Sequence, residues 1–106
     1  MKSELRLQRQ IMIDCGKRGW LCYHFNPGGA LRPDGFYFNS GVPEGWPDLI
    51  VITKSNTYYI EIKTPTGRLS TNQKKMLELL PNSYVVRSLK QWEDLTKTFT
   101  NLPAQT

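Results

Sequence analysis

Two carboxylates and one ammonium group, carried by Asp48, Glu61 and Lys63, are the side chains whose types and spacing point most directly to chemistry. Asp48 precedes an apolar, β-branched run at residues 49–52, and the other two lie in a second such run at residues 57–63. A short polar segment separates the runs, so we expect a β-hairpin. If its turn has an even number of residues, all three side chains share one face, whereas an odd-length turn would separate them.

This arrangement of charges predicts a cation site. Carboxylates that face each other across paired strands repel, so the pair is unfavourable unless positive charge lies between them. A hard divalent cation supplies that charge, because such ions prefer oxygen ligands. The alternative for Glu61 and Lys63 is an exposed polar strand face with solvated charges, and Asp48 on the same face is what favours the cation site.

Length and composition limit the class of protein. A chain of 106 residues predicts a single domain over residues 1–106. Lys and Arg total 14 against 9 for Asp and Glu, and the net charge of +5 favours a polyanionic partner. Cys15 and Cys22 match no metal-ligand spacing, so we interpret them as buried, reduced thiols. With no apolar run near the roughly 20 residues of a membrane span and no signal-peptide core, we expect a soluble, cytoplasmic protein that is not secreted.

Hydrophobic periodicity predicts the elements that position these groups. A helix is expected over residues 3–17, ending before Gly19, with an apolar stripe formed by Leu5, Leu7, Ile11, Met12 and Cys15. A strand at 20–25, a long loop at 26–45 with a short extended piece at 36–38, and the hairpin should follow. Ser70 then begins a second helix ended by Pro81, a strand follows at 84–86, and Ser88 begins a last helix. The order αβββαβα predicts an α/β fold in which helices pack on a mixed sheet.

The motifs in this order resemble those of a known nuclease group. Pro47-Asp48 followed by Glu61-Ile62-Lys63 resembles the PD-(D/E)XK signature of restriction-endonuclease-like phosphodiesterases. The wider pattern resembles a free-standing, minimal member of the VRR-NUC family and covers about Glu4 to Ser88. That wider pattern consists of Glu4, Gln8, Gly45, Pro47-Asp48, Glu61-Ile62-Lys63, Gly67-Arg68-Leu69-Ser70 and Gln73.

The resemblance implies a restriction-endonuclease-like αβββαβ core and a Mg²⁺-dependent endonuclease, with Mn²⁺ also supporting activity. Asp48, Glu61 and the backbone carbonyl of Ile62 would be metal ligands, and Lys63 would orient or help to deprotonate the attacking water. Phosphodiester hydrolysis suits such a site, because its catalysis depends on positioning and charge stabilisation. Glu4 would be a further carboxylate that reaches the metal or its water, or else a first-turn charge favoured by the helix dipole.

Other polar residues have two interpretations each. Gln73 forms a capping box with Ser70, which is compatible with an active-site role. Three basic residues near the second helix contact DNA phosphates or are ordinary solvated charges, namely Arg68, Lys74 and Lys75. The aromatic residues at 36–38 stack on unpaired bases or pack the loop against the core or another subunit. His24, on a strand, is interpreted as packed or surface-facing.

The resemblance also implies a structure-specific DNA endonuclease that cuts branched DNA, such as four-way (Holliday) junctions, as a homodimer. Ile13, Trp46 and the aromatics at 36–38 favour the dimer, because they exceed what a small core readily covers. A two-fold dimer would present two related metal centres to the junction, and a monomer whose aromatics all pack inward is the alternative. The other functions considered are a flap or nicking nuclease and a non-catalytic nucleic-acid-binding module that retains the fold.

Overall fold

The computed structural model describes residues 2–25, 29–31, 37–39 and 43–100. The elements in this part of the chain are α1 (Lys2–Arg18), β1 (Leu21–His24), β2 (Gly29–Leu31), β3 (Tyr37–Asn39), β4 (Leu49–Ile52), β5 (Thr57–Ile62), α2 (Thr71–Leu79), β6 (Ser83–Val86) and α3 (Leu89–Thr100). No helix in these ranges has the length and apolar character needed to cross a bilayer. The predicted helices and main-sheet strands agree with these bounds to within a few residues.

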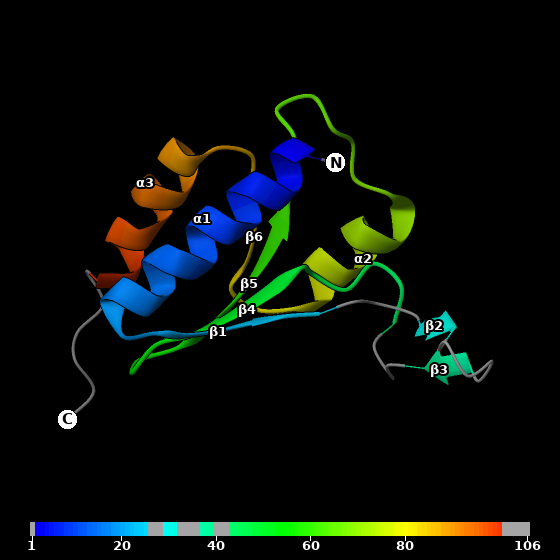
Figure 1. The fold of residues 1–106 in the computed structure, drawn as a ribbon, viewed down its shortest axis with the longest axis horizontal. Helices are drawn as coiled ribbons and strands as arrows, with labels where there is room; N and C mark the ends of the chain where they lie inside the picture. Colours follow the sequence, from blue (N-terminus) through cyan, green and yellow to red (C-terminus); the bar gives the residue numbers. More distant parts are fainter. Residues whose placement is uncertain (1, 26–28, 32–36, 40–42, 101–106) are drawn as a thin grey trace.

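The main sheet has the strand order β1-β4-β5-β6 (Figure 1). β1 pairs with β4 and β4 with β5 in antiparallel fashion, whereas β6 runs parallel to β5. The predicted α/β class, the mixed sheet and the αβββαβα order of the core elements are therefore confirmed. The parallel pair places the carboxyl ends of β5 and β6 side by side, which is the edge where α/β folds commonly bind ligands.

The segment predicted to be a long loop contains a second sheet. β2 and β3 pair antiparallel, with Ala30 opposite Phe38. The extended piece predicted at 36–38 corresponds to β3 within one residue, whereas β2 was not predicted. The reason is that Gly29-Ala30-Leu31 has little strand propensity and is held by pairing with a partner several residues away. Phe36 and the side chains of Tyr37 and Phe38 lie outside the described residues, and so does their predicted role.

The hairpin register satisfies the even-turn condition. Leu49 pairs with Ile60 and Ile52 with Thr57, which leaves a four-residue turn at 53–56. In that turn the Thr53 hydroxyl accepts hydrogen bonds from the backbone N–H groups of Ser55 and Asn56, both at 3.2 Å. Even-numbered positions of β4 therefore share a face with odd-numbered positions of β5.

The opposite face of the hairpin forms the hydrophobic core with α1 and α3. Its fully or almost fully buried members are Leu7, Ile11, Cys15, Leu49, Val51, Tyr58, Ile60, Ile62, Val86, Trp92 and Phe99. Leu5 does not belong to it, since 44% of its surface is exposed; at 100° per residue it lies about 120° around α1 from Ile11. Ile13 is 61% exposed and points away from the core, as expected. Both cysteines are free, with Cys15 buried and Cys22 half-buried.

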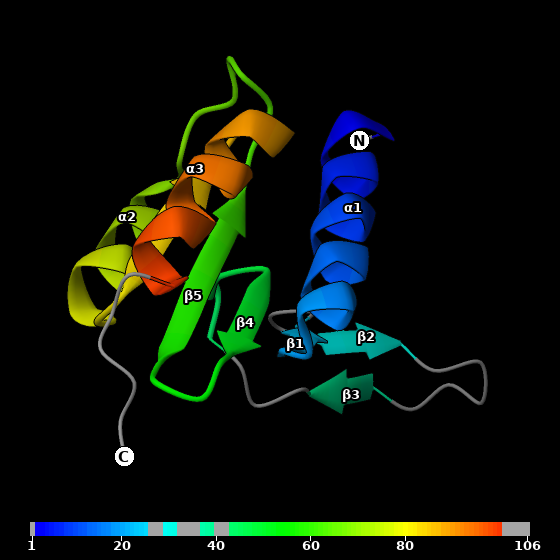
Figure 2. The ribbon, with the colours of Figure 1, turned by 90° about the vertical axis from the view of Figure 1, so that its left-hand side faces the viewer.

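The end of α1 determines how the chain enters the sheet. Gly19 adopts a φ of +77°, and the N–H of Trp20 donates to the carbonyl of Cys15 at 2.9 Å. These features form a Schellman motif, which requires a left-handed residue that glycine supplies without strain. The chain then reverses into β1, so that the N-terminal end of α1 lies at the same end of the molecule as the carboxyl end of β5 (Figures 1 and 2).

Candidate active site

Asp48 lies immediately before β4 and is fixed from two sides. Its backbone carbonyl accepts a hydrogen bond from the N–H of Phe25 at 3.0 Å, which extends the β1–β4 ladder by one residue. Its side-chain Oδ2 accepts from the backbone N–H of Ile62 at 2.7 Å. The preceding Pro47 has a fully buried side chain, which anchors the chain before the turn to Asp48. The carboxylate is therefore directed at the carboxyl end of β5.

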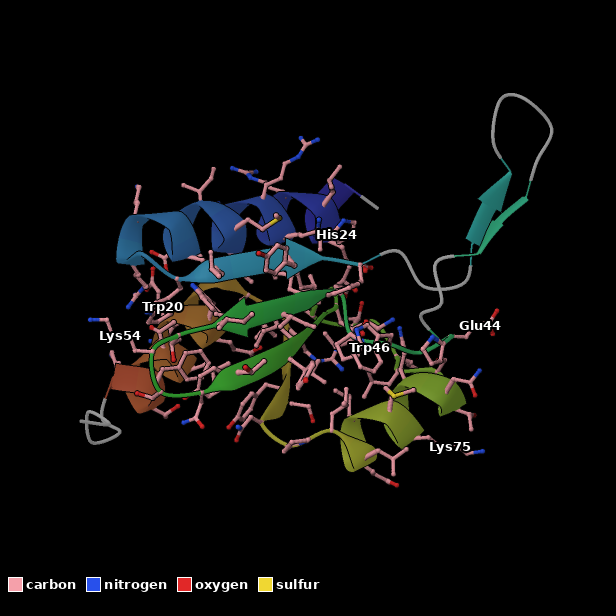
Figure 3. All side chains as sticks on the ribbon, turned by 90° about the horizontal axis from the view of Figure 1, so that it is seen from below. Trp20, His24, Glu44, Trp46, Lys54 and Lys75 are labelled. Atoms are coloured by element: carbon pink, nitrogen blue, oxygen red, sulfur yellow. The ribbon has the colours of Figure 1, made fainter. Side chains whose placement is uncertain are left out.

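The turn before Asp48 packs against α2 at a distance that admits only glycine. Gly45 has a φ of +87°, and a Cβ atom built on it would lie 2.4 Å from the backbone carbon of Asn72. Trp46, the next residue, lies between the β4–β5 hairpin and α2 (Figure 3), with edge-to-face ring contacts to Phe25 and Tyr59. The close approach of Gly45 to Asn72 joins the Asp48 segment to α2, the helix that carries Gln73.

Glu61 is the most unusual group at the site, because only 2% of this carboxylic acid is exposed. The backbone register places it on the same face of the sheet as Asp48. Burial has the largest effect and, with the adjacent charge of Asp48, raises the pKa of Glu61 to about 8, and Glu4 adds to the rise. The ammonium of Lys63 opposes it. A carboxyl group in this environment needs either a proton or a cation.

Gln73 connects Glu61 to the start of α2. Its Nε2 donates to Glu61 Oε2 at 3.0 Å, while its Oε1 accepts from the N–H of Ser70 at 2.8 Å. The Ser70 hydroxyl in turn accepts from the N–H of Gln73 at 3.1 Å, which completes the predicted capping box. The capping contact is thus present together with a contact to Glu61. The other carboxylate oxygen, Glu61 Oε1, is buried and has no hydrogen-bond partner.

Lys63 and Glu4 complete a cluster of charges around this pair. Lys63 is half-buried just beyond β5, and its backbone N–H donates to the carbonyl of Val86 at 3.1 Å. Glu4, half-buried in the first turn of α1, is close enough to affect the pKa of Glu61. Within the described ranges, however, no three His, Cys, Asp or Glu side chains gather as a metal-binding group. The structure therefore brings Asp48 and Glu61 together as a pair and leaves direct ligation by Glu4 a prediction.

The remaining predicted residues lie farther out. Arg68, Lys74 and Lys75 are all exposed, the first before α2 and the others on it, and Lys75 is labelled in Figure 3. His24 is exposed at the end of β1, in agreement with the surface interpretation, and Gln8 is half-buried on α1. The exposure of these three cations is compatible with phosphate contacts and with solvated surface charges alike.

Sequence reasoning missed two contacts at this end of the sheet. The backbone N–H of Ile62 holds Asp48, although only its carbonyl had been considered. Arg87, directly after β6, donates from Nη1 to the carbonyls of Thr64 and Gly67 at 2.8 and 2.6 Å. The sequence did hold an indication of the Arg87 contact. A cation that directly follows β6, the strand parallel to β5, lies at the same end of the sheet as the end of β5.

The comparisons with known proteins are consistent with this geometry. A family model described as the VRR-NUC domain matches residues 3–92, a range that includes every residue of the charged cluster. Searches of curated proteins and of solved structures gave no match.

Proposed function

The chain belongs to the VRR-NUC family, which implies a nuclease-like function, and on this premise we propose that it is a Mg²⁺- or Mn²⁺-dependent DNA endonuclease. The observation that carries the proposal is the pair of Asp48 and Glu61, two carboxyl groups side by side, one of them buried. A buried carboxylate beside a like charge destabilises the ligand-free protein, so its presence favours a function that uses the charge.

The donor set suits a hard divalent cation. Glu61 Oε1 is buried without a partner, although buried carboxylate oxygens are normally hydrogen-bonded. Asp48, Glu61 and the carbonyl of Ile62 would hold the ion, and Glu4 would be a fourth source of oxygen. When bound, the ion would stabilise charge on the phosphate and make the attacking water more acidic.

The chain's own residues would orient the reactants. The N–H of Ile62 holds Asp48 through Oδ2, and Gln73 holds Glu61 through Oε2. Each contact restrains one oxygen of its carboxylate and fixes the direction of the other. Lys63, whose ammonium is close enough to Glu61 to lower its pKa, would position the attacking water and offset the negative charge that develops on the phosphate.

We also propose branched DNA, such as a four-way junction, as the substrate and a symmetric homodimer as the active unit. Support comes from β1, whose outer edge has no partner strand among the described residues. Leu21 and Tyr23 on this strand are 55% and 52% exposed, and they project from the same face as Glu61. In Figure 3 none of the described helices lies in front of β1 and β4. An apolar edge of this kind fits a second copy of the chain. The carboxylate site of that copy would then lie near the carboxylate site of the first. Trp46 does not add to this support, because its ring packs against Phe25 and Tyr59.

A cleavage assay tests the catalytic proposal. Four-way junction, flap, duplex and single-stranded DNA are incubated with Mg²⁺, Mn²⁺ or EDTA. Asp48→Ala and Glu61→Ala should abolish cleavage and weaken metal binding, because each removes a carboxylate. Lys63→Ala should abolish cleavage and leave metal binding intact or tighter, since it removes a competing positive charge. Full activity of Asp48→Ala in Mg²⁺ would reject the assignment, and metal-independent DNA binding without cleavage would favour the non-catalytic module.

Light scattering after size exclusion tests the dimer. The wild-type protein at micromolar concentration should show twice the monomer mass, and the double substitution Leu21→Lys and Tyr23→Lys should reduce it to the monomer. Leu79→Lys is the control, because Leu79 is 77% exposed on α2, away from β1. A monomer that retains junction cleavage would contradict the dimer while leaving the nuclease proposal in place.

A further inference from the structure

We propose that Arg87 is a positioning residue that fixes the turn after β5 and thereby the placement of Lys63. This inference rests on the nuclease function proposed above. Arg87 follows β6 directly, and β6 runs parallel to β5 with Val86 opposite Ile62. The backbones of Arg87 and Lys63 therefore leave the sheet at the same edge, next to each other.

The side chain of Arg87 is directed into that turn. Nη1 donates to the carbonyl of Thr64 at 2.8 Å and to the carbonyl of Gly67 at 2.6 Å. The turn is also closed by the N–H of Gly67, which donates to Thr64 at 3.2 Å. Hydrogen bonds from a charged donor are stronger than neutral ones, so the guanidinium is the strongest of these contacts. It holds both ends of the turn at once.

The turn that Arg87 holds also constrains Lys63. A Cβ atom built on Gly67 would lie 2.9 Å from the Thr64 hydroxyl and 3.5 Å from Cδ of Lys63. The turn backbone at Gly67 thus passes close to the aliphatic part of the Lys63 side chain, so a shift of the turn would change the space open to that side chain. The same turn leads into Arg68 and the capping box of α2, so its displacement would reach Gln73 as well.

The backbone of Arg87 is itself held by the first turn of α3. Its backbone N–H donates to Oε1 of Gln91 at 2.7 Å, and the Ser88 hydroxyl accepts from the N–H of Gln91 at 3.1 Å. These contacts fix the start of α3, the helix whose Trp92 is completely buried. Arg87 therefore connects a rigid part of the molecule to the loop that follows the reactive lysine. A phosphate-binding role would need a guanidinium that faces solvent, as exposed Arg68 does.

Kinetics of variants with a four-way junction as the probe test this role. Arg87→Ala should lower kcat about 10–100-fold with little change in KM, because a displacement of about 1 Å at a reacting group has an effect of this size. Millimolar guanidinium should restore part of that loss, and Arg87→Lys should retain an intermediate kcat, since a lysine donates without the planar fork. Arg18→Ala is the charge-matched control, because Arg18 pairs with Asp14 at the far end of α1.

Amide hydrogen exchange of the metal-free, ¹⁵N-labelled protein gives a measurement that does not depend on cleavage. The Gly67 amide should exchange at least about tenfold faster in Arg87→Ala than in the wild type, because opening of this turn is local. Arg87→Lys covers the case in which the alanine variant fails to fold. If kcat and Gly67 exchange both stay at wild-type values, the proposal is overturned; a loss confined to KM and reversed at low salt would make Arg87 a phosphate contact instead. If the wild type cleaves no DNA, the nuclease proposal fails, and the exchange data alone decide whether Arg87 holds the turn.

Discussion

The two faces of β5 are built by opposite rules. On one face Tyr58, Ile60 and Ile62 are at most 2% exposed and pack against an apolar core. On the other face Glu61 is equally buried, but it is a carboxylic acid next to a second one. The first face stabilises the fold by removing apolar surface from water, whereas the second places a costly group where water cannot solvate it.

This difference separates stability from function along one strand. Residues next to each other in β5 belong to different parts of the molecule, because successive side chains of a strand point to opposite faces. A conflict between local preference and burial is expected where a protein binds or reacts, and Glu61 is such a place. Substitutions on the two faces should therefore have opposite signatures.

The largest effect is expected for Glu61→Gln. Cleavage should fall by at least about 10²–10³-fold, the cost of removing one key electrostatic group. In EDTA at pH 8 the same variant should be more stable than the wild type, because an amide has no charge to desolvate. Glu78→Gln, on the exposed face of α2, serves as control and should change neither property. If Glu61→Gln lost activity because its melting temperature fell, the separation of stability from function on the two faces of β5 would be contradicted.

The mirror-image substitution is Ile60→Ala on the core face. Deleting this buried side chain should destabilise the protein by about 2–5 kcal/mol, through lost apolar burial and the cavity left behind. Cleavage by the folded fraction at low temperature should stay within a few-fold of the wild type. Ile13→Ala, at a position that is 61% exposed, should cost less than about 0.5 kcal/mol. Denaturant melts combined with single-turnover rates give both quantities.

The pH dependence of the metal-free protein sharpens the comparison. The pKa of Glu61 is about 8 in the folded protein against an ordinary 4.5, so the unfolded chain releases this proton first as the pH rises. The stability linked to Glu61 is therefore complete below about pH 4.5 and lost as the pH rises through about 8, by on the order of a few kcal/mol. Urea melts in EDTA across this range should show the decline in the wild type. Equal pH slopes for the wild type and Glu61→Gln would contradict the assignment.

The smallest effects are expected at the exposed cations. If Arg68, Lys74 and Lys75 touch DNA phosphates, each alanine variant should reduce the magnitude of the salt slope of binding by about one unit. Binding should weaken similarly for different DNA sequences, because phosphate contacts carry no sequence information. Fluorescence anisotropy with Ca²⁺ or EDTA, at several salt concentrations, measures the slope without cleavage. Unchanged slopes in all three variants would leave these residues as solvated surface charges.

The sequence predicted features that depend on local rules. The parity of the hairpin put Asp48 and Glu61 on one face, and the spacing of Ser70 and Gln73 predicted the capping box, since both depend on residues close in sequence. The pairing of β2 with β3 is also local, but Gly29-Ala30-Leu31 has too little strand propensity to indicate it. The contact of Arg87 with Thr64 could not be read from local rules, because the approach of these two residues is decided by how β5 and β6 pair.

The two side-chain hydrogen bonds of Gln73 have a consequence for how this position can evolve. A capping box accepts either Glu or Gln at its third helical position. Here the side-chain nitrogen faces Glu61 Oε2 at 3.0 Å, so a glutamate would keep the cap but place a like charge against a buried carboxylate. An aliphatic residue would lose both contacts. Selection at this one position therefore acts through two unrelated requirements, and among the residues that complete the cap only glutamine meets both.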